Sequence, residues 1–265
     1  MVNGKCSNKQ KDKRIRKLLD VFEQAYNKNK NYLTPKLYVQ WLDVLTNVGL
    51  IDRALQVTEL ATAQYPKSLL LWKHKLDIMV RGSASDSDVI QVFKESLKHV
   101  AEKESVCLWT LVMEYCSYST SDEFKALLEK GLMSGPDVSC PVKEFYLQWT
   151  YLNSDIHQAR NLYKRLIQMK PVTKQFYQYY IAMEMAQPKS KTKLLRRTFE
   201  DVVTEFGFKD ADIWIDYIKF ELNSPKGKPE EIGNIHFRAV KCLNGELNQR
   251  FIAQFTLLQT GIGQS

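Results

Sequence analysis

Two stretches of the sequence, FYQYYIAME at residues 176–184 and IWIDYIKFE at residues 213–221, carry the same pattern 37 residues apart. Each has an aromatic residue, a second aromatic three positions later and a glutamate four positions after that. These residues are Tyr177, Tyr180 and Glu184 in the first stretch and Trp214, Tyr217 and Glu221 in the second. Spacings of three and four residues place side chains on one face of an α-helix. The two stretches therefore predict equivalent helices in neighbouring repeats.

The first aromatic position recurs along the chain at intervals of 31 to 37 residues. Its members are Tyr38, Trp72, Trp109, Tyr146, Tyr177, Trp214 and Phe251. A further aromatic follows three positions later in four of these segments, as Trp41, Trp149, Tyr180 and Tyr217. A period in the mid-thirties is typical of helical-hairpin repeats. We expect these eleven aromatics to be structural repeat anchors, burying roughly 150–250 Å² each in the core between units.

A second series lies between these positions, at the centres of amphipathic segments 35 to 38 residues apart. Its members are Phe22, Thr58, Phe93, Leu128, Tyr163, Phe199 and Phe237. An i, i+4 stripe is completed four positions earlier by Leu18, Ala54, Val89, Phe124, Ala159, Leu195 and Gly233. Two series with one period predict paired helices that share a core with their neighbours.

The helix boundaries follow from these series and from the residues between them. First helices are predicted at about 36–47, 68–81, 105–117, 142–153, 173–186, 210–223 and 248–259. Second helices are predicted at about 12–28, 52–64, 87–101, 121–133, 156–169, 192–206 and 230–243. Helix ends are indicated by Pro66, Pro136 and Pro171, and N-caps by Asp52, Ser87, Ser121 and Asp155.

The predicted fold is all-α, a right-handed solenoid of about six to seven antiparallel helix pairs. Residues 1–11 are expected to be a basic, disordered N-terminus. Residues 12–265 are expected to form a single array that begins on a second-type helix, which is typical of a fragment or a short isoform.

The composition excludes several classes of protein. The chain has 265 residues, 44% of them hydrophobic, which is enough for a continuous core. No run approaches the roughly 20 apolar residues of a membrane span, and no secretory signal is present. Five scattered cysteines without a zinc spacing favour a reducing intracellular compartment. Six of the eight net positive charges lie in residues 1–30, so a long electropositive groove is not expected.

The first helices resemble the HAT (half-a-tetratricopeptide) family, whose pattern is aromatic, aromatic and acid. Tyr177, Tyr180 and Glu184 match it, as do Trp214, Tyr217 and Glu221, each with a second helix such as ARNLYKRLI at 159–167. A tetratricopeptide helix would contain a Leu-Gly pair, and no predicted first helix contains glycine. The acid is absent at the equivalent positions Leu45, Met79, Cys116, Asn153 and Leu258. Glu184 and Glu221 are expected either to hold a helix turn by hydrogen bonding or to be solvated.

This resemblance implies a protein-protein scaffold in an RNA-processing assembly. Residues 210–245 are most similar to the C-terminal part of a HAT subunit of the small-subunit processome. The resemblance then implies a nuclear, nucleolar role in 18S ribosomal RNA processing and ribosome biogenesis, with small nucleolar RNA nearby. The partners would be other protein subunits of a large ribonucleoprotein, with indirect RNA contact. Two alternatives stay open: a HAT scaffold of pre-mRNA splicing or 3′-end processing, and a sequence-tolerant RNA-binding repeat module.

Residues for catalysis or cofactor binding are not recognisable in the sequence. The four histidines, His74, His99, His157 and His236, have no metal or triad spacing, and no phosphate-binding glycine loop occurs. We therefore expect no enzyme activity, cofactor, metal, membrane or small-molecule substrate.

Two basic clusters have ambiguous roles. One spans Lys5 to Lys17, and the other comprises Lys189, Lys191, Lys193, Arg196 and Arg197. The second cluster is a candidate patch for phosphate or an acidic partner, or a nuclear import signal, although a solvated helix start is the favoured explanation. Tyr179 is the aromatic near it that is most expected to be exposed and free for base stacking.

Overall fold

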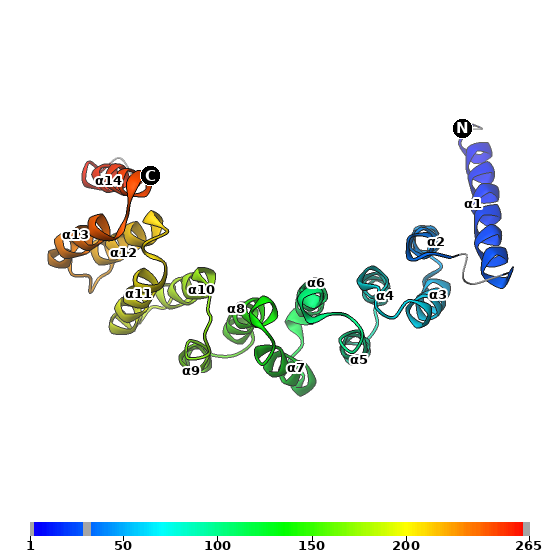
Figure 1. Ribbon diagram of the computed structural model, residues 1–265, viewed down its shortest axis with the longest axis horizontal. Helices are drawn as coiled ribbons and strands as arrows, with labels where there is room; N and C mark the ends of the chain where they lie inside the picture. Colours follow the sequence, from blue (N-terminus) through cyan, green and yellow to red (C-terminus); the bar gives the residue numbers. More distant parts are fainter. Residues whose placement is uncertain (1–2, 29–32, 262–265) are drawn as a thin grey trace. The chain divides into compact units, whose positions relative to one another are not determined.

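The computed structural model describes residues 3–28 and 33–261, with side chains from residue 13 onward. These residues contain fourteen α-helices and no β-strand (Figure 1). The chain divides into two compact units, Met1–Trp149 and Thr150–Ser265. The predicted all-α fold of paired helices is confirmed, because a helix lies at every predicted first-helix and second-helix position.

The first unit contains seven complete helices and most of an eighth. They are α1 (Asn3–Lys28), α2 (Pro35–Asn47), α3 (Ile51–Gln64), α4 (Leu69–Arg81), α5 (Asp86–Ser96), α6 (Val106–Tyr115), α7 (Asp122–Leu132) and α8 (Pro136–Asn153). Short 3-10 turns precede and follow α6, at Glu102–Ser105 and Cys116–Tyr118.

The second unit contains the end of α8 and six further helices. They are α9 (Ile156–Leu166), α10 (Lys174–Met185), α11 (Thr192–Phe206), α12 (Ala211–Asn223), α13 (Ile232–Cys242) and α14 (Gly245–Gln259). A 3-10 turn at Pro229–Glu231 precedes α13.

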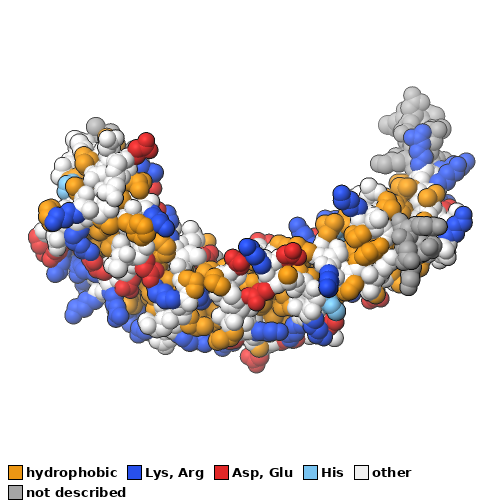
Figure 2. All heavy atoms as spheres, viewed as in Figure 1, with side chains coloured by type: hydrophobic (Ala, Val, Ile, Leu, Met, Phe, Trp, Pro, Cys, Tyr) orange, Lys and Arg blue, Asp and Glu red, His pale blue; other side chains and the backbone are white. Residues whose placement is uncertain are grey.

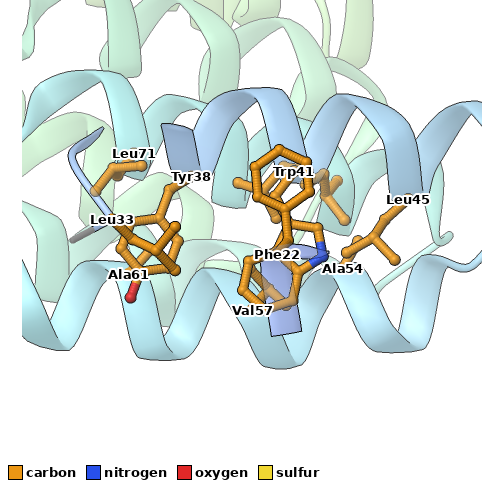
Figure 3. Packing of buried hydrophobic residues seen from close by; sticks show 11 residues of the cluster. Phe22, Leu33, Tyr38, Trp41, Leu45, Ala54, Val57, Ala61 and Leu71 are labelled. Atoms are coloured by element: carbon orange, nitrogen blue, oxygen red, sulfur yellow. The ribbon is translucent and has the colours of Figure 1, made fainter. Parts of the chain in front are cut away.

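The two sequence series meet in the core as stacked rings. Phe22 of α1 stacks on Trp41 of α2 at 5.8 Å between centroids, with 7° between the ring planes. In Figure 3 Trp41 lies among the side chains of a cluster that also includes Ala54 and Val57 of α3. The central aromatic of this second helix thus lies on the second aromatic of the next first helix, which converts the repeat period into inter-helix packing.

The same stacking recurs twice in the second unit. Tyr163 of α9 stacks on Tyr180 of α10 at 3.5 Å, with 9° between the planes. Phe199 of α11 stacks on Tyr217 of α12 at 5.0 Å, with 3° between the planes. One contact type therefore builds helix pairs at both ends of the described chain.

Several boundaries predicted from the sequence are wrong. Helix α1 begins at Asn3 instead of residue 12, so residues 3–11 are helical; this segment has no proline, and its three lysines and one glutamine are good helix formers. Helix α8 begins at Pro136 instead of residue 142, because a proline is tolerated at the first helical position. The second proline, Pro141, lies inside α8.

Three predicted core positions and two predicted caps are also wrong. Leu18 is 43% exposed, and Gly233 is exposed as well. Phe237 is 57% exposed, and the buried stripe of α13 is formed instead by Ile235 and Ala239. The long connection before α13, which includes a 3-10 turn, shifts its register relative to the 36-residue period. The N-cap of α5 is Ser85, and α3 has no side-chain cap, whereas Ser121 and Asp155 cap α7 and α9 as predicted.

A glycine in α7 is packed tightly against side chains of α6 and α8. A Cβ on Gly131 would lie 2.9 Å from the Trp109 ring and 3.0 Å from Val142. Gly131→Ala should therefore destabilise the protein by about 1–3 kcal/mol through overpacking, despite the higher helix propensity of alanine. Thermal unfolding followed by circular dichroism measures the change.

The matched control is Gly233→Ala in α13, where a Cβ would meet no atom within 4 Å. This substitution should leave the stability unchanged or raise it by up to about 1 kcal/mol. Equal effects of the two alanines would contradict a steric role for Gly131.

Candidate functional site

The eleven predicted repeat anchors are all buried in the structure. Their exposed fractions do not exceed 7% for Tyr38, Trp41, Trp72, Trp109, Tyr146, Trp149, Tyr177, Tyr180, Trp214, Tyr217 and Phe251. Two of them also donate hydrogen bonds to the backbone of the segment that precedes their helix. Trp214 Nε1 donates to Gly207 O at 2.9 Å, and Trp72 Nε1 donates to Pro66 O at 2.7 Å. These rings are therefore not accessible for stacking on bases, while Tyr179 is half-exposed.

The glutamates of the two matching stretches are buried in the second unit. Glu184 of α10 is fully buried and accepts two hydrogen bonds from Arg160 of α9, from Nε at 2.8 Å and from Nη2 at 2.6 Å. The backbone N–H of Lys191 donates to Glu184 Oε1 at 2.7 Å. One carboxylate thus links two helices and the start of the next, an arrangement that we call the Arg160–Glu184 clamp.

The second clamp has the same three parts one repeat later. Glu221 of α12, 1% exposed, accepts from Arg196 of α11, from Nε at 2.7 Å and from Nη2 at 3.0 Å. The backbone N–H of Lys228 donates to Glu221 Oε2 at 2.7 Å. Arg196 also donates to the carbonyl of Lys226 at 2.6 Å. In both clamps the backbone donor lies seven residues after the glutamate, so each fixes the loop that follows a first helix.

A close backbone contact completes the second clamp. A Cβ on Gly227 would lie 2.1 Å from the carbonyl oxygen of Glu221, so a side chain cannot be accommodated there without moving the loop. The Gly227 N–H donates to Ser224 O at 2.8 Å. Glycine at this position lets the loop turn tightly enough to bring the Lys228 N–H to the carboxylate.

Hydrogen bonding keeps the first clamp ionised. Burial raises the pKa of Glu184, but hydrogen bonds from the Arg160 guanidinium and the Lys191 N–H outweigh burial and hold that pKa below its ordinary value. The hydrogen bond to Glu184 likewise raises the pKa of Arg160. A buried charge pair of this kind is stable only while both partners and their hydrogen bonds remain.

Three other repeats have apolar residues at both positions of the clamp. Where the acid gives way to Leu45, Met79 or Cys116, these side chains are buried. The position that corresponds to Arg160 and Arg196, three residues before the central residue of the second helix, is then Leu19, Leu55 or Ile90. A lone buried charge is costly, which explains why an apolar residue at one position accompanies an apolar residue at the other.

The predicted five-residue basic patch is not a single free surface. The Arg196 side chain is only 23% exposed and is committed to Glu221 and the following loop. Side chains of Lys189, Lys191, Lys193 and Arg197 are exposed. The sequence could not distinguish these cations from Arg196, because the partner of Arg196 lies 25 residues further along the chain.

Sequence reasoning missed three polar residues that join repeats. Arg160 is buried on the apolar face of α9. Its position three residues before the core residue Tyr163 was the one sequence feature that indicated its burial. Glu200 accepts from both Arg238 Nη atoms, at 2.9 and 2.5 Å, and from Tyr217 OH at 2.9 Å. The contacts of Glu200 connect α11, α12 and α13, and the residues involved do not recur at a fixed spacing in the sequence.

The described residues contain no group of three or more His, Cys, Asp or Glu side chains that could hold a metal ion. None of the described helices meets the length and hydropathy that a bilayer-spanning segment requires.

The buried cysteine should be chemically inert. Burial raises the pKa of the Cys116 thiol to about 12, whereas Cys107 is exposed. Because the thiolate is the reactive form, iodoacetamide at pH 7.5 should alkylate Cys107 and spare Cys116, as peptide mapping by mass spectrometry would measure. Equal modification of both residues in the folded protein would contradict the burial of Cys116.

A family model described as "U3 small nucleolar RNA-associated protein 6 C-terminal" matches residues 2–243. The chain belongs to this family. The U3 small nucleolar RNA-associated protein 6 homolog of Mus musculus is 32% identical over 250 residues, and the Homo sapiens homolog is 31% identical over 252 residues. Each alignment covers 94% of this chain and 41% of the relative, so the chain spans less than half the length of these proteins. The resemblance of residues 210–245 is thus confirmed at the level of the family.

One solved structure is similar over most of the chain. It is the C-terminal part of a TPR repeat-containing protein from Cytophaga hutchinsonii, 17% identical, with a TM-score of 0.42. The alignment covers 92% of this chain and 95% of that one.

Proposed function

We propose that the protein is a non-catalytic scaffold that binds other protein subunits within a nucleolar ribonucleoprotein and supports 18S ribosomal RNA processing. The membership in the U3 small nucleolar RNA-associated protein 6 C-terminal family carries this proposal. The structure supports it because buried polar groups such as Glu184 and Glu221 serve to hold helices and loops together. Such a framework presents fixed surfaces to partners without requiring a reaction centre.

The direct test is to purify the tagged protein from cells and quantify the RNAs that accompany it. U3 small nucleolar RNA should be enriched at least about tenfold over a spliceosomal small nuclear RNA, and depletion should raise unprocessed precursors of 18S ribosomal RNA. Enrichment of spliceosomal or 3′-end-processing RNA instead would overturn the nucleolar proposal and favour the alternative HAT scaffold. Fluorescence microscopy of the tagged protein checks the nucleolar location independently.

A matched pair of variants tests whether recovery of U3 RNA depends on the folded second unit. Glu184→Met should break the Arg160–Glu184 clamp, and it should reduce recovery of U3 RNA. The same substitution at Glu23, a half-exposed partner of Arg53, should leave recovery unchanged.

A further inference from the structure

The N-terminal helix α1 carries an exposed basic face. Lys13, Arg14, Arg16 and Lys17 lie within little more than one turn, and all four side chains are exposed. Residues 13–19 contain no acid. Among the described residues none of the four cations forms an ion pair, and Figure 2 shows Lys and Arg side chains gathered over this helix. We call these four residues the α1 basic face.

The packing of α1 leaves this face free. The contacts to α2 run through the second half of the helix, where Phe22 and Tyr26 lie against Trp41. At 100° per residue, Lys13 and Lys17 point almost opposite to Phe22 and are about 6 Å apart along the helix axis. The core therefore holds α1 in place while its cations project away from that core.

Positive charge is largely neutralised elsewhere. Several exposed or half-exposed arginines in other helices are paired, as in Arg53 with Glu23, Arg238 with Glu200 and Arg250 with Asp212. The chain after residue 30 contains 29 basic and 27 acidic residues. Among the side chains that the structure describes, the α1 basic face is consequently the densest cluster of cations without an ion pair.

We propose that the α1 basic face binds the phosphate backbone of RNA directly and without base specificity. Phosphates are contacted chiefly by Lys and Arg, and each neutralised phosphate releases counterions, which favours binding to closely spaced cations. The centre of a protein interface is by contrast depleted in charged residues, especially lysine, so an acidic protein is the less suitable occupant. This RNA contact is separate from the scaffold function, since it requires no partner protein.

The test measures binding of the purified full chain to a fluorescein-labelled 20-nucleotide oligouridine by anisotropy at several salt concentrations. The variant Lys13→Gln/Arg14→Gln/Arg16→Gln/Lys17→Gln removes four charges and keeps a good helix former at each position. It should bind at least about tenfold more weakly at low salt, and its slope of log affinity against log salt should be smaller by about 2–3.

The control removes four charges elsewhere, by Lys189→Gln/Lys191→Gln/Lys193→Gln/Arg197→Gln, and leaves Arg196 in its clamp. It should change affinity less than about threefold. Equal losses in the two variants, or no loss in the α1 variant, would overturn the proposal, because net charge or another surface would then govern binding. The wild type could also bind poly-glutamate as tightly as it binds the oligouridine, and the α1 variant could lose that binding. This result would overturn the proposal and assign the face to an acidic protein. Circular dichroism confirms that both variants are folded.

Discussion

Replacing Glu184 by methionine should destabilise the second unit by about 3–5 kcal/mol, because it leaves the Arg160 guanidinium buried without its carboxylate. The Lys191 N–H would lose its acceptor in the same substitution. Hydrogen-exchange mass spectrometry should show faster exchange across α9 to α11, and urea unfolding should give the free-energy change. The exposed control Glu23→Met should cost no more than about 1 kcal/mol.

A double variant distinguishes the cost of an unpaired buried charge from the cost of changed side-chain packing. Arg160→Leu/Glu184→Met reproduces Leu55 and Met79, the residues that an earlier repeat has at the equivalent positions. The double variant should therefore be more stable than Glu184→Met alone, with a residual cost of about 1–3 kcal/mol for the unpaired Lys191 N–H. A double variant less stable than the single one would show that the clamp is not exchangeable between repeats.

Acid should weaken the same clamp. The pKa of Glu184 is lower in the folded protein than its ordinary value, so the unfolded chain binds the proton more readily. The contribution of this carboxylate is complete above its unfolded pKa and is lost as the pH falls through the folded pKa. The difference in stability between wild type and the double variant should consequently shrink below about pH 4.

The sequence predicted the helices and the buried aromatics because both depend on local periodicity. Tyr177 and Tyr180 lie three residues apart and share a helix face, so their burial follows from spacing alone. The register of α13 was wrong because the fixed period was extended across a long connection, which moved Phe237 off the core face.

The sequence indicated only the acidic partner of each clamp. Glu184 and Glu221 stood out by their repeat position, but their partners Arg160 and Arg196 belong to the preceding helices, 24 and 25 residues away. A basic side chain near other basic residues looks the same in sequence whether it is solvated or paired, which is why Arg196 was grouped with a surface patch. Pairing between helices depends on side-chain geometry that composition does not contain.

Replacing Trp214 by alanine should destabilise the second unit by about 3–5 kcal/mol. The ring is 3% exposed, its Nε1 donates to Gly207 O, and the Arg238 guanidinium of α13 lies 5.6 Å from the ring centroid. Alanine would leave a cavity between α12 and its neighbours. The Gly207 carbonyl would lose its hydrogen-bond donor, and the Arg238 guanidinium would lose the aromatic ring it contacts. Residues 170–265 should then exchange amide hydrogens faster before the first unit does, as measured by hydrogen-exchange mass spectrometry.

Trp214→Phe separates the volume of the ring from its hydrogen bond. Phenylalanine keeps much of the ring volume but cannot donate to Gly207 O, so it should cost about 1–2 kcal/mol, clearly less than alanine. Gly207→Ala tests the same contact by changing the residue that accepts the hydrogen bond. The Cβ of the alanine would lie 2.9 Å from the Trp214 ring and 2.3 Å from Val203 O. A loss below about 1 kcal/mol for Trp214→Ala would show that this tryptophan does not support the core of its repeat, against its burial and its contacts.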